Sequence, residues 1–336
     1  MKKQVLIIDS TLRDGSHAIK HQLTRPIIEH YSKAAENAHI PVIVVGHGNG
    51  LGASSLQLGR SLLGDLEMLS LAKKNLVKTR LGAFFIPGFG TIKNDLLPAI
   101  SLGIDVLMIA SHCTEANITR EHIEFAKNRK VKVYGVLMMS HMASEKELLK
   151  QAGLMQSYGA DGVILMDSAG ASLPSEVGKK IKILTRNLNI EVGFHAHNNL
   201  GLSIANSIAA VEQGAGIIDG TTRGFGAGAG NCQLEVIIAV FNKLGVKTGV
   251  DLFKLMDASE QIISKIMPKL QEISSIELTS GLAGVFSGFA PHAKRAAKNF
   301  GVDVREIILE LGRRKAVAGQ EDYIVDIAYS LRKNAH

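Results

Sequence analysis

The amino-acid sequence predicts a (β/α)8 TIM barrel followed by a helical C-terminal extension. Three observations support this prediction: eight short apolar runs rich in strand-forming residues, helical periodicity between them, and the end of this alternation near residue 245 of 336. Nearly continuous apolar strands that alternate with helices are typical of a parallel sheet covered on both faces. Because eight such units occur in about the usual length, the sequence favours a closed barrel over an open sheet.

The predicted strands are separated by segments with the spacing of amphipathic helices. Thr24 and Pro26 predict where the first helix begins, because threonine often caps a helix and proline is tolerated in its first turn. The strands are VLIID (5–9), PVIVVG (41–46), LGAFFI (81–86), DVLMIA (105–110), VYGVLMM (133–139), GVILMD (162–167), IEVGFHAH (190–197) and GIIDG (216–220), and the helical segments include RPIIEHYSKAAENAH (25–39), EHIEFAKNR (121–129), ELLKQAGLMQSYGA (147–160), SEVGKKIKILTRN (175–187) and LSIANSIAAVEQG (202–214).

The chain after about residue 245 has helical patterns and no further strand pattern. We therefore expect a barrel domain at 1–245 and a helical extension at 246–336. The extension could pack under the barrel, cover its mouth or contact another chain, and the sequence leaves these alternatives open. The helical patterns are LFKLMDASEQIISKIM (252–267), HAKRAAKNFG (292–301), VREIILELG (304–312) and EDYIVDIAYSLRK (321–333).

Composition limits the kinds of partner that the protein can have. There is no tryptophan and only 5% aromatic residues, which argues against an aromatic platform for sugars or nucleic acids. The net charge of +7 is spread along the chain rather than clustered, so no nucleic-acid partner is expected. Two cysteines are too few for a disulfide framework, and no apolar run is long enough for a signal peptide core or a membrane span. We expect a cytoplasmic protein without a membrane partner.

The strongest chemical signal is the pair His195 and His197 at the end of the seventh predicted strand. Residues two apart on a strand point to the same face, and barrel active sites lie where the strands end. A bare pair of this spacing is more often two hydrogen-bonded histidines than a metal site. Its position on a barrel strand favours metal ligation.

A third, anionic ligand would complete a site of two histidines and one carboxylate. Asp14, just after the first predicted strand, is the leading candidate, because the inward-facing ends of all strands converge in a closed barrel. Asp9 and Asp167 are alternatives, and spacing alone does not decide among the three.

The residues around Asp14 provide further candidates for catalysis. Arg13 offers a planar fork that can bind a carboxylate or an enolate, although most arginines form surface ion pairs. His17 can act as a general acid or base, because imidazole titrates near neutral pH. His21 is expected to belong to the scaffold.

Several polar loops follow the other predicted strands and are expected to line the same cavity. Ser168 of MDSAG (166–170) is a candidate substrate-binding residue. The glycine run RGFGAGAGN (223–231) resembles a dinucleotide fingerprint, but it follows the last strand rather than opening the first βαβ unit. We instead expect a tight loop with Asn231 near the N-cap of the next helix, where an anion can bind. The other loops are VGHGNG (45–50), SHCTEA (111–116) and MMSHM (138–142), in which His47, His112 and His141 are either functional or structural.

Taken together, these motifs resemble the 4-hydroxy-2-oxovalerate aldolase family, within the wider group of metal-dependent barrels that includes HMG-CoA lyase and isopropylmalate synthase. The resemblance extends over almost the whole chain. Its motifs, in order, are TLRDGSHAI (11–19), SHCTEA, LMMSHM (137–142), HAHNNL (195–200), ANSIAAVE (205–212), GAGAGN (226–231) with LEV after it, and GQEDYIVD (319–326).

The resemblance implies retro-aldol cleavage of a 4-hydroxy-2-oxo acid to pyruvate and an aldehyde. It implies that Asp14, His195 and His197 hold a divalent metal, typically Mn²⁺. It further implies that Arg13 stabilises the pyruvate enolate and that His17 is the base toward the 4-hydroxyl group. Family members usually work with an acylating aldehyde dehydrogenase, so this partner is expected as well.

This sequence departs from the family pattern at three places. Phe286, a candidate substrate-binding residue, stands where the family has a tyrosine and cannot donate a hydrogen bond. Asn198 replaces a histidine, and Arg223 precedes the glycine run where small apolar residues are expected. These departures leave open which aldehyde the protein releases.

Three other functions are alternatives to this aldolase. One is a Claisen-type acyltransferase on the same metal barrel, although the C-terminal GQEDYIVD motif argues against it. Another is a non-catalytic subunit that stabilises a dehydrogenase, against which the retained candidate residues argue. The third is a biosynthetic aldolase that condenses pyruvate with a bulkier aldehyde.

Overall fold

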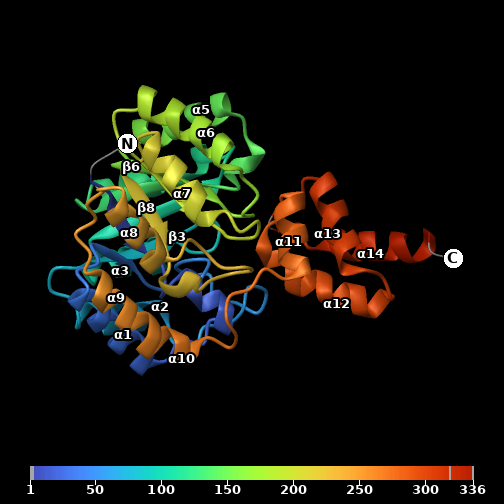
Figure 1. Cartoon of the computed structure of the whole chain (residues 1–336), viewed down its shortest axis with the longest axis horizontal. Coiled ribbons are helices and arrows are strands. Elements are labelled where there is room, and N and C mark those ends of the chain that lie inside the picture. Colours follow the sequence, from blue (N-terminus) through green and yellow to red (C-terminus); the bar gives the residue numbers. More distant parts are fainter. Residues whose placement is uncertain (1–3, 318, 335–336) are drawn as a thin grey trace.

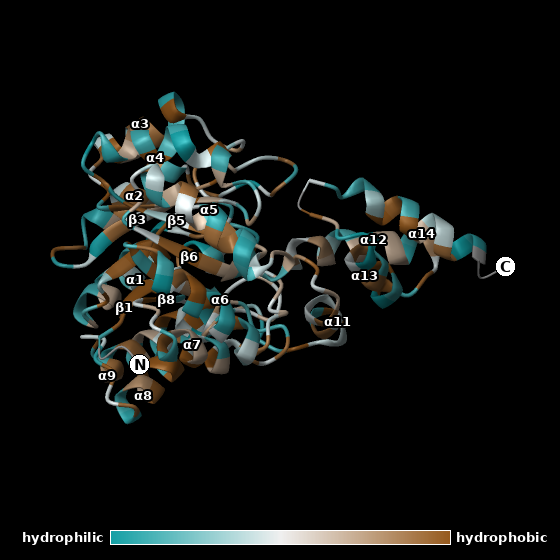
Figure 2. Ribbon diagram, turned by 90° about the horizontal axis from the view of Figure 1, so that it is seen from above, coloured by the Kyte–Doolittle hydropathy of each residue, from teal (hydrophilic) through white to brown (hydrophobic). Residues whose placement is uncertain are grey.

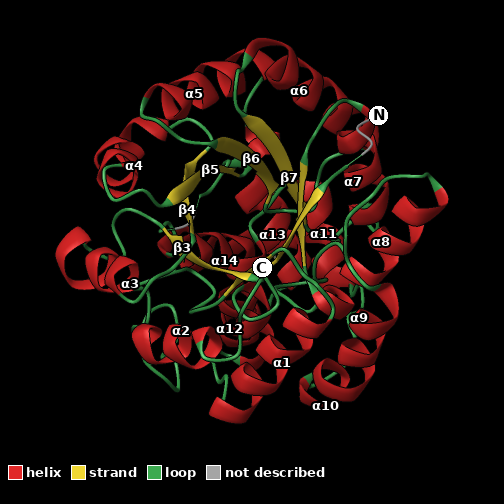
Figure 3. Cartoon of the chain, turned by 90° about the vertical axis from the view of Figure 1, so that its left-hand side faces the viewer, coloured by secondary structure: helices red, strands yellow, loops and turns green. Residues whose placement is uncertain are grey.

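The chain forms a closed parallel barrel of eight strands, as the sequence predicts. The computed structural model describes residues 4–317 and 319–334. Each strand pairs with its neighbours in sequence order, and β8 closes the ring on β1, with Ile8 opposite Asp219. Figure 3 shows the ring of helices around the strands. The strands are β1 (Leu6–Asp9), β2 (Val42–Val44), β3 (Arg80–Phe85), β4 (Val106–His112), β5 (Lys132–Met138), β6 (Gly162–Asp167), β7 (Glu191–Ala196) and β8 (Ile217–Gly220).

The apolar core has one layer inside the barrel and another between the strands and the surrounding helices. Successive side chains of a strand point to opposite faces, so Ile8 packs inside the barrel whereas Ile7 packs against the helices. In Figure 2 the central strands are largely hydrophobic and the helices show hydrophilic outer faces. This double burial explains why the strands read as continuous apolar runs rather than alternating ones.

Eight α-helices cover the outside of the barrel between residues 25 and 243. Thr24 is the N-cap residue of the first helix, and Pro26 lies in its first turn, as predicted. The Thr24 side chain, however, makes no capping hydrogen bond. The predicted start of the helix is therefore confirmed, and the expected capping contact is not. The helices are α1 (Arg25–Asn37), α2 (Asp65–Lys73), α3 (Leu97–Ser101), α4 (Arg120–Lys127), α5 (Glu145–Ser157), α6 (Pro174–Asn187), α7 (Ser203–Glu212) and α8 (Leu234–Lys243).

The C-terminal extension has two parts with different packing. The first part contributes Leu255, Ala258 and Ile263 to the core of the barrel. The second part is a separate bundle with its own apolar core, which includes Phe289 and Ile308 (Figure 1). The first part contains α9 (Leu252–Ala258) and α10 (Ser264–Ile266), and the bundle contains α11 (Ser275–Ala283), α12 (Ala290–Phe300), α13 (Val304–Arg313) and α14 (Asp322–Asn334).

The bundle lies beside the end of the barrel at which the strands finish. His141, in the loop after β5, makes a hydrogen bond of 3.0 Å from its Nε2 atom to the backbone oxygen of Gly284. Asn199, in the loop after β7, donates to the backbone oxygen of Glu277 (3.1 Å) and to Ser287 Oγ (3.3 Å). The structure thus places the bundle at the mouth of the barrel and not beneath it. None of the described helices combines the length and apolar character that a membrane crossing requires.

Candidate metal centre at the barrel mouth

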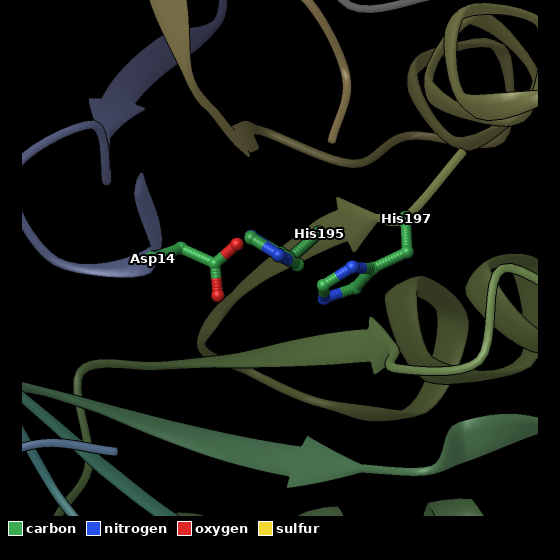
Figure 4. A group of neighbouring side chains, drawn as sticks. All are labelled: Asp14, His195 and His197. Atoms are coloured by element: carbon green, nitrogen blue, oxygen red, sulfur yellow. The ribbon is translucent and has the colours of Figure 1, made fainter. Parts of the chain in front are cut away.

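Three candidate ligands from opposite ends of the barrel sequence meet at its mouth. Asp14, His195 and His197 each offer one ligand atom, and these atoms lie within 4.8 Å of one another (Figure 4). His195 lies on β7, His197 directly follows this strand, and Asp14 begins a short 3-10 helix after β1. Closure of the barrel brings them together, because β1 and β7 both pair with β8.

The Asp14 carboxylate is buried and has polar partners on both oxygens. Arg13 Nη1 donates to Oδ1 at 2.9 Å, and Asn231 Nδ2 donates to Oδ2 at 2.5 Å. Burial opposes ionisation of this carboxyl, but the positive charge of Arg13 outweighs it and holds the pKa of Asp14 well below its usual range. Asp14 is therefore an anion at neutral pH, as a metal ligand must be.

The other two acidic candidates are engaged elsewhere. Asp9 accepts hydrogen bonds from the Thr11 backbone N–H (2.8 Å) and the Tyr31 hydroxyl (2.6 Å), and burial raises its pKa to about 6. Asp167 accepts from the backbone N–H groups of Ala171 and Ser172, both at 3.1 Å. Of the three acids left open by spacing, Asp14 is the one in the cluster.

The glycine run holds Asn231 against the candidate ligand Asp14, a contact that the sequence did not predict. The N-cap of α8 is Gln233, and Asn231 lies earlier, in a loop hydrogen-bonded to the end of β7. A Cβ atom on Gly226 would collide with the Asn231 amide and the Asp14 carboxylate, so this approach requires glycine. The clue in the sequence was a polar residue that ends a glycine loop after the last barrel strand.

The donor set at this site fits a divalent cation. His195 Nε2, His197 Nδ1 and Asn231 Oδ1 are buried and have no hydrogen-bond partner among the described residues. Burial lowers the pKa of His197 to about 4, so its imidazole is neutral and able to bind a metal. Two imidazoles, an anionic carboxylate and an amide oxygen are typical ligands of divalent transition metals, and orphaned polar atoms are costly to bury without a partner.

Arg13 lies beside the cluster and has an N–H donor that is not used in a hydrogen bond to any described residue. Its guanidinium stacks over the Phe84 ring, 4.6 Å from the ring centre, and Nη1 also approaches the backbone oxygen of Gly48 at 3.4 Å. Its Nε atom is buried without a hydrogen-bond partner in the described chain. The geometry leaves this arginine able to bind an anionic group next to the three candidate ligands.

His17 lies at the same mouth, three residues after Asp14. Burial lowers the pKa of its imidazole, and the negative charge of Asp14 and a hydrogen bond to the Gly48 backbone only partly oppose this. Its neighbour His21 stacks on His47 with ring centres 3.7 Å apart and contacts Ser16 Oγ at 3.1 Å. These contacts suit the scaffold role expected for His21.

The remaining candidate residues lie in different surroundings. Ser168 Oγ accepts a hydrogen bond of 3.0 Å from the Met139 backbone N–H, so its own hydroxyl hydrogen stays available. The Phe286 ring packs edge-on against Phe289 of the bundle, at 6.2 Å between ring centres. Arg223 directs Nη1 to Ser259 Oγ at 3.4 Å. This contact is with a residue that follows α9, outside the metal cluster.

Asn198, which follows His197, contacts the next helix. Its Oδ1 atom accepts hydrogen bonds from the Ser203 backbone N–H at 3.2 Å and from the Ser203 hydroxyl at 2.8 Å. This replacement for the family histidine therefore supports the start of α7.

A cavity of about 330 Å³ lies at the junction between the barrel mouth and the bundle. His17, the glycine loop at 225–228, Glu277, Ser287 and Lys294 are among the residues that line it. The cavity therefore extends from His17, the candidate base, to Lys294 on the bundle.

Solved structures with the same fold include two proteins of different similarity. The N-terminal domain of a putative aldolase from Bacteroides vulgatus superposes with a TM-score of 0.73 at 25% identity, covering 84% of this chain and 94% of that one. The carboxyl transferase domain of Rhizobium etli pyruvate carboxylase superposes with a TM-score of 0.83 at 16% identity, covering 99% of this chain and 61% of that one. The second similarity concerns the fold alone.

Sequence comparisons are more specific. The HMGL-like family model matches residues 100–262, and the DmpG-like communication domain matches residues 271–333. The chain is 53% identical to a 4-hydroxy-2-oxovalerate aldolase of Pectobacterium atrosepticum, over 99% of this chain and 97% of that protein. It is 51% identical to one of Spirochaeta aurantia over the same shares. These relatives share about half of their residues with this chain over nearly its whole length, and the chain has the candidate metal-ligand cluster at the barrel mouth. The chain therefore belongs to the 4-hydroxy-2-oxovalerate aldolase family.

Proposed function

We propose that this protein is a carbon–carbon lyase that cleaves a 4-hydroxy-2-oxo acid to pyruvate and an aldehyde. One observation supports this above the others: Asp14, His195 and His197 converge beside a buried arginine at the mouth of the barrel. The relatives with about half of their residues identical are named for the five-carbon acid 4-hydroxy-2-oxovalerate, which is the first substrate to test.

Asp14, His195 and His197 are the residues proposed to hold the metal, with the Asn231 amide oxygen as a further donor. We propose Mn²⁺ as the ion, following the family resemblance, since nitrogen and oxygen ligands of this kind also suit other divalent metals. A bound divalent cation would supply Lewis-acid polarisation of the substrate's 2-oxo group.

Arg13 and His17 are proposed to divide the remaining chemistry. The His17 imidazole accepts the proton of the 4-hydroxyl group, and the O–H electron pair forms the aldehyde C=O bond. The C3–C4 bond breaks, its electron pair passes to C2–C3, and the 2-oxo oxygen gains the charge of the enolate. Arg13 neutralises this charge through fixed N–H donors, and a proton added at C3 completes pyruvate.

His17 gives this proposal a pH dependence. Because burial disfavours the imidazolium form, the pKa of His17 lies below its ordinary value of 6.5, and the neutral base is present above that lowered pKa. We expect kcat/KM at saturating metal to fall as pH decreases through a midpoint below 6.5. His17→Gln should lower kcat by about 100-fold to 10,000-fold and remove this acidic limb. An unchanged acidic limb in this variant would assign the titration to another group.

The bundle is the proposed contact with an acylating aldehyde dehydrogenase. The communication-domain match covers α11 to α14, and these helices expose apolar side chains spaced four residues apart. Leu278 and Leu282 on α11 are 49% and 73% exposed, and Val325 and Tyr329 on α14 are 52% and 50% exposed. Apolar stripes of this kind are typical of protein contact sites. The aldehyde would then be released near the bundle, where the junction cavity lies.

A substrate panel tests the proposed function. We expect pyruvate from 4-hydroxy-2-oxopentanoate or a longer homologue when Mn²⁺ is supplied, with and without a co-expressed acylating aldehyde dehydrogenase. Phe286→Tyr should change the rate or the preferred chain length, because it adds a hydroxyl group to the segment beside the mouth. Release of no pyruvate across the panel would overturn the aldolase proposal, and consumption of acetyl-CoA with a 2-oxo acid would instead indicate the acyltransferase.

A further inference from the structure

Asp219 faces the candidate metal ligand His195 from the neighbouring strand. The two residues are opposite one another in the β7–β8 pairing, and both side chains point into the barrel, fully buried. Asp219 Oδ2 lies 2.8 Å from His195 Nδ1, a short but bent contact, and neither atom has another polar partner in the described chain. The second oxygen, Oδ1, accepts a hydrogen bond of 2.7 Å from Ser10 Oγ.

The same contacts continue to the other side of the metal cluster. Arg13 Nη2 lies 3.4 Å from Ser10 Oγ, and Arg13 Nη1 donates to Asp14 Oδ1 at 2.9 Å. A continuous chain of polar contacts therefore runs from His195 through Asp219, Ser10 and Arg13 to Asp14. Its two ends are the candidate ligands contributed by β7 and by the loop after β1.

We propose that Asp219 and Ser10 are positioning residues that hold His195 and Arg13 in the arrangement needed for metal binding and cleavage. This inference rests on the proposed metal-dependent function. With Nδ1–H of His195 held by the Asp219 carboxylate, the lone pair of Nε2, which is buried and has no hydrogen-bond partner among the described residues, is left free for the metal. A carboxylate behind a metal-binding histidine sets its tautomer and ring orientation and increases its basicity.

The burial of these groups explains why this series of polar contacts is needed. His195 and Asp219 are both 0% exposed, so no solvent can orient the ring or satisfy the carboxylate. Ser10 is also fully buried and contacts both Asp219 and Arg13 through one hydroxyl group. The orientation of the guanidinium is thus coupled to that of the imidazole, which keeps the substrate-binding donor at a set place relative to the metal.

Metal affinity measured without substrate tests this inference. In Asp219→Asn the charge is lost and the amide can present its N–H to His195, which favours the wrong tautomer. We expect Mn²⁺ to bind about 10-fold to 100-fold more weakly, as followed by the electron paramagnetic resonance signal of free Mn²⁺. The matched control is Asp9→Asn, because Asp9 is equally buried at the end of β1 but contacts Thr11 and Tyr31 instead.

A double-mutant cycle separates positioning from a general loss of structure. In a His195→Ala background, Asp219→Asn should cause little further loss of Mn²⁺ affinity, because its effect acts through the histidine. Ser10→Ala leaves Asp219 in place, and it is the second variant to measure if Asp219→Asn does not fold. It should weaken Mn²⁺ binding about threefold to tenfold, since it removes the hydrogen bond that Ser10 donates to the Asp219 carboxylate.

Defined results would overturn the inference. One is an Mn²⁺ affinity within twofold of the wild type in folded Asp219→Asn or in Ser10→Ala. Another is an equal loss of Mn²⁺ affinity in Asp9→Asn and Asp219→Asn. The third is that Asp219→Asn lowers Mn²⁺ affinity as much in the His195→Ala background as in the wild type. If Mn²⁺ binding responds as expected but no substrate of the panel yields pyruvate, the positioning role stands and the aldolase proposal fails. The two failures are therefore distinguishable.

Discussion

Replacing His195 with alanine is expected to lower kcat/KM for pyruvate release by about 1,000-fold or more. The change removes one of the two imidazole donors and leaves Asp14 and His197 to hold the cation alone. A metal chelator should have the same effect on the wild-type protein, and added Mn²⁺ should restore activity to the wild type but not to the variant. Pyruvate can be followed with a coupled reductase, and bound metal by elemental analysis.

His122→Ala is the matched control for this experiment. His122 lies on α4, outside the barrel, where its ring approaches Phe85 with 5.0 Å between ring centres. This variant should keep its metal content and its rate of pyruvate release. The proposed metal site would be wrong if His195→Ala kept both its metal content and at least a tenth of the wild-type activity.

Replacing Arg13 with lysine is expected to lower kcat by about 100-fold to 1,000-fold. Lysine keeps a positive charge beside Asp14 but has no planar fork, so it cannot contact Asp14, Ser10 and an enolate oxygen at once. In Arg13→Ala the charge is lost as well, and the pKa of Asp14 should rise because Arg13 is the largest of the influences that lower it. Arg13→Ala should therefore lose both catalysis and metal affinity.

Comparison of the two Arg13 variants separates charge from geometry. We expect Arg13→Lys to retain most of its Mn²⁺ affinity while kcat falls, and Arg13→Ala to lose both. Arg80→Lys is the control, because Arg80 begins β3 at the opposite end of the barrel and should leave kcat unchanged. A kcat for Arg13→Ala within threefold of the wild type would remove Arg13 from the proposed mechanism.

The barrel could be predicted because its signal is local. A strand buried on both faces needs apolar residues at nearly every position, and a helix on its outside needs them every three or four residues. Both patterns can be read within ten or so residues. The helix α11 was not predicted, because Thr279, Ser280 and Gly281 interrupt its apolar pattern and its packing partners belong to other helices.

The candidate site was predictable only in part. The spacing of His195 and His197 on one strand is a local pattern, and so is the grouping of Arg13, Asp14 and His17 after the first strand. Which acid joins the histidines is not a local property, because Asp9, Asp14 and Asp167 all follow or end a strand. Hydrogen bonds to Thr11, Tyr31 and backbone N–H groups engage the other two acids and leave Asp14 in the cluster.

The sequence by itself determined the fold class, the end of the barrel that carries the polar loops and the main candidate residues. The tertiary structure alone decided the contacts of Asn231, Asp219 and Ser10. Asn231 meets Asp14 from 217 residues away, and Asp219 meets Ser10 from 209 residues away. Such pairs become neighbours only when β8 closes on β1, so no pattern within a single segment can reveal them.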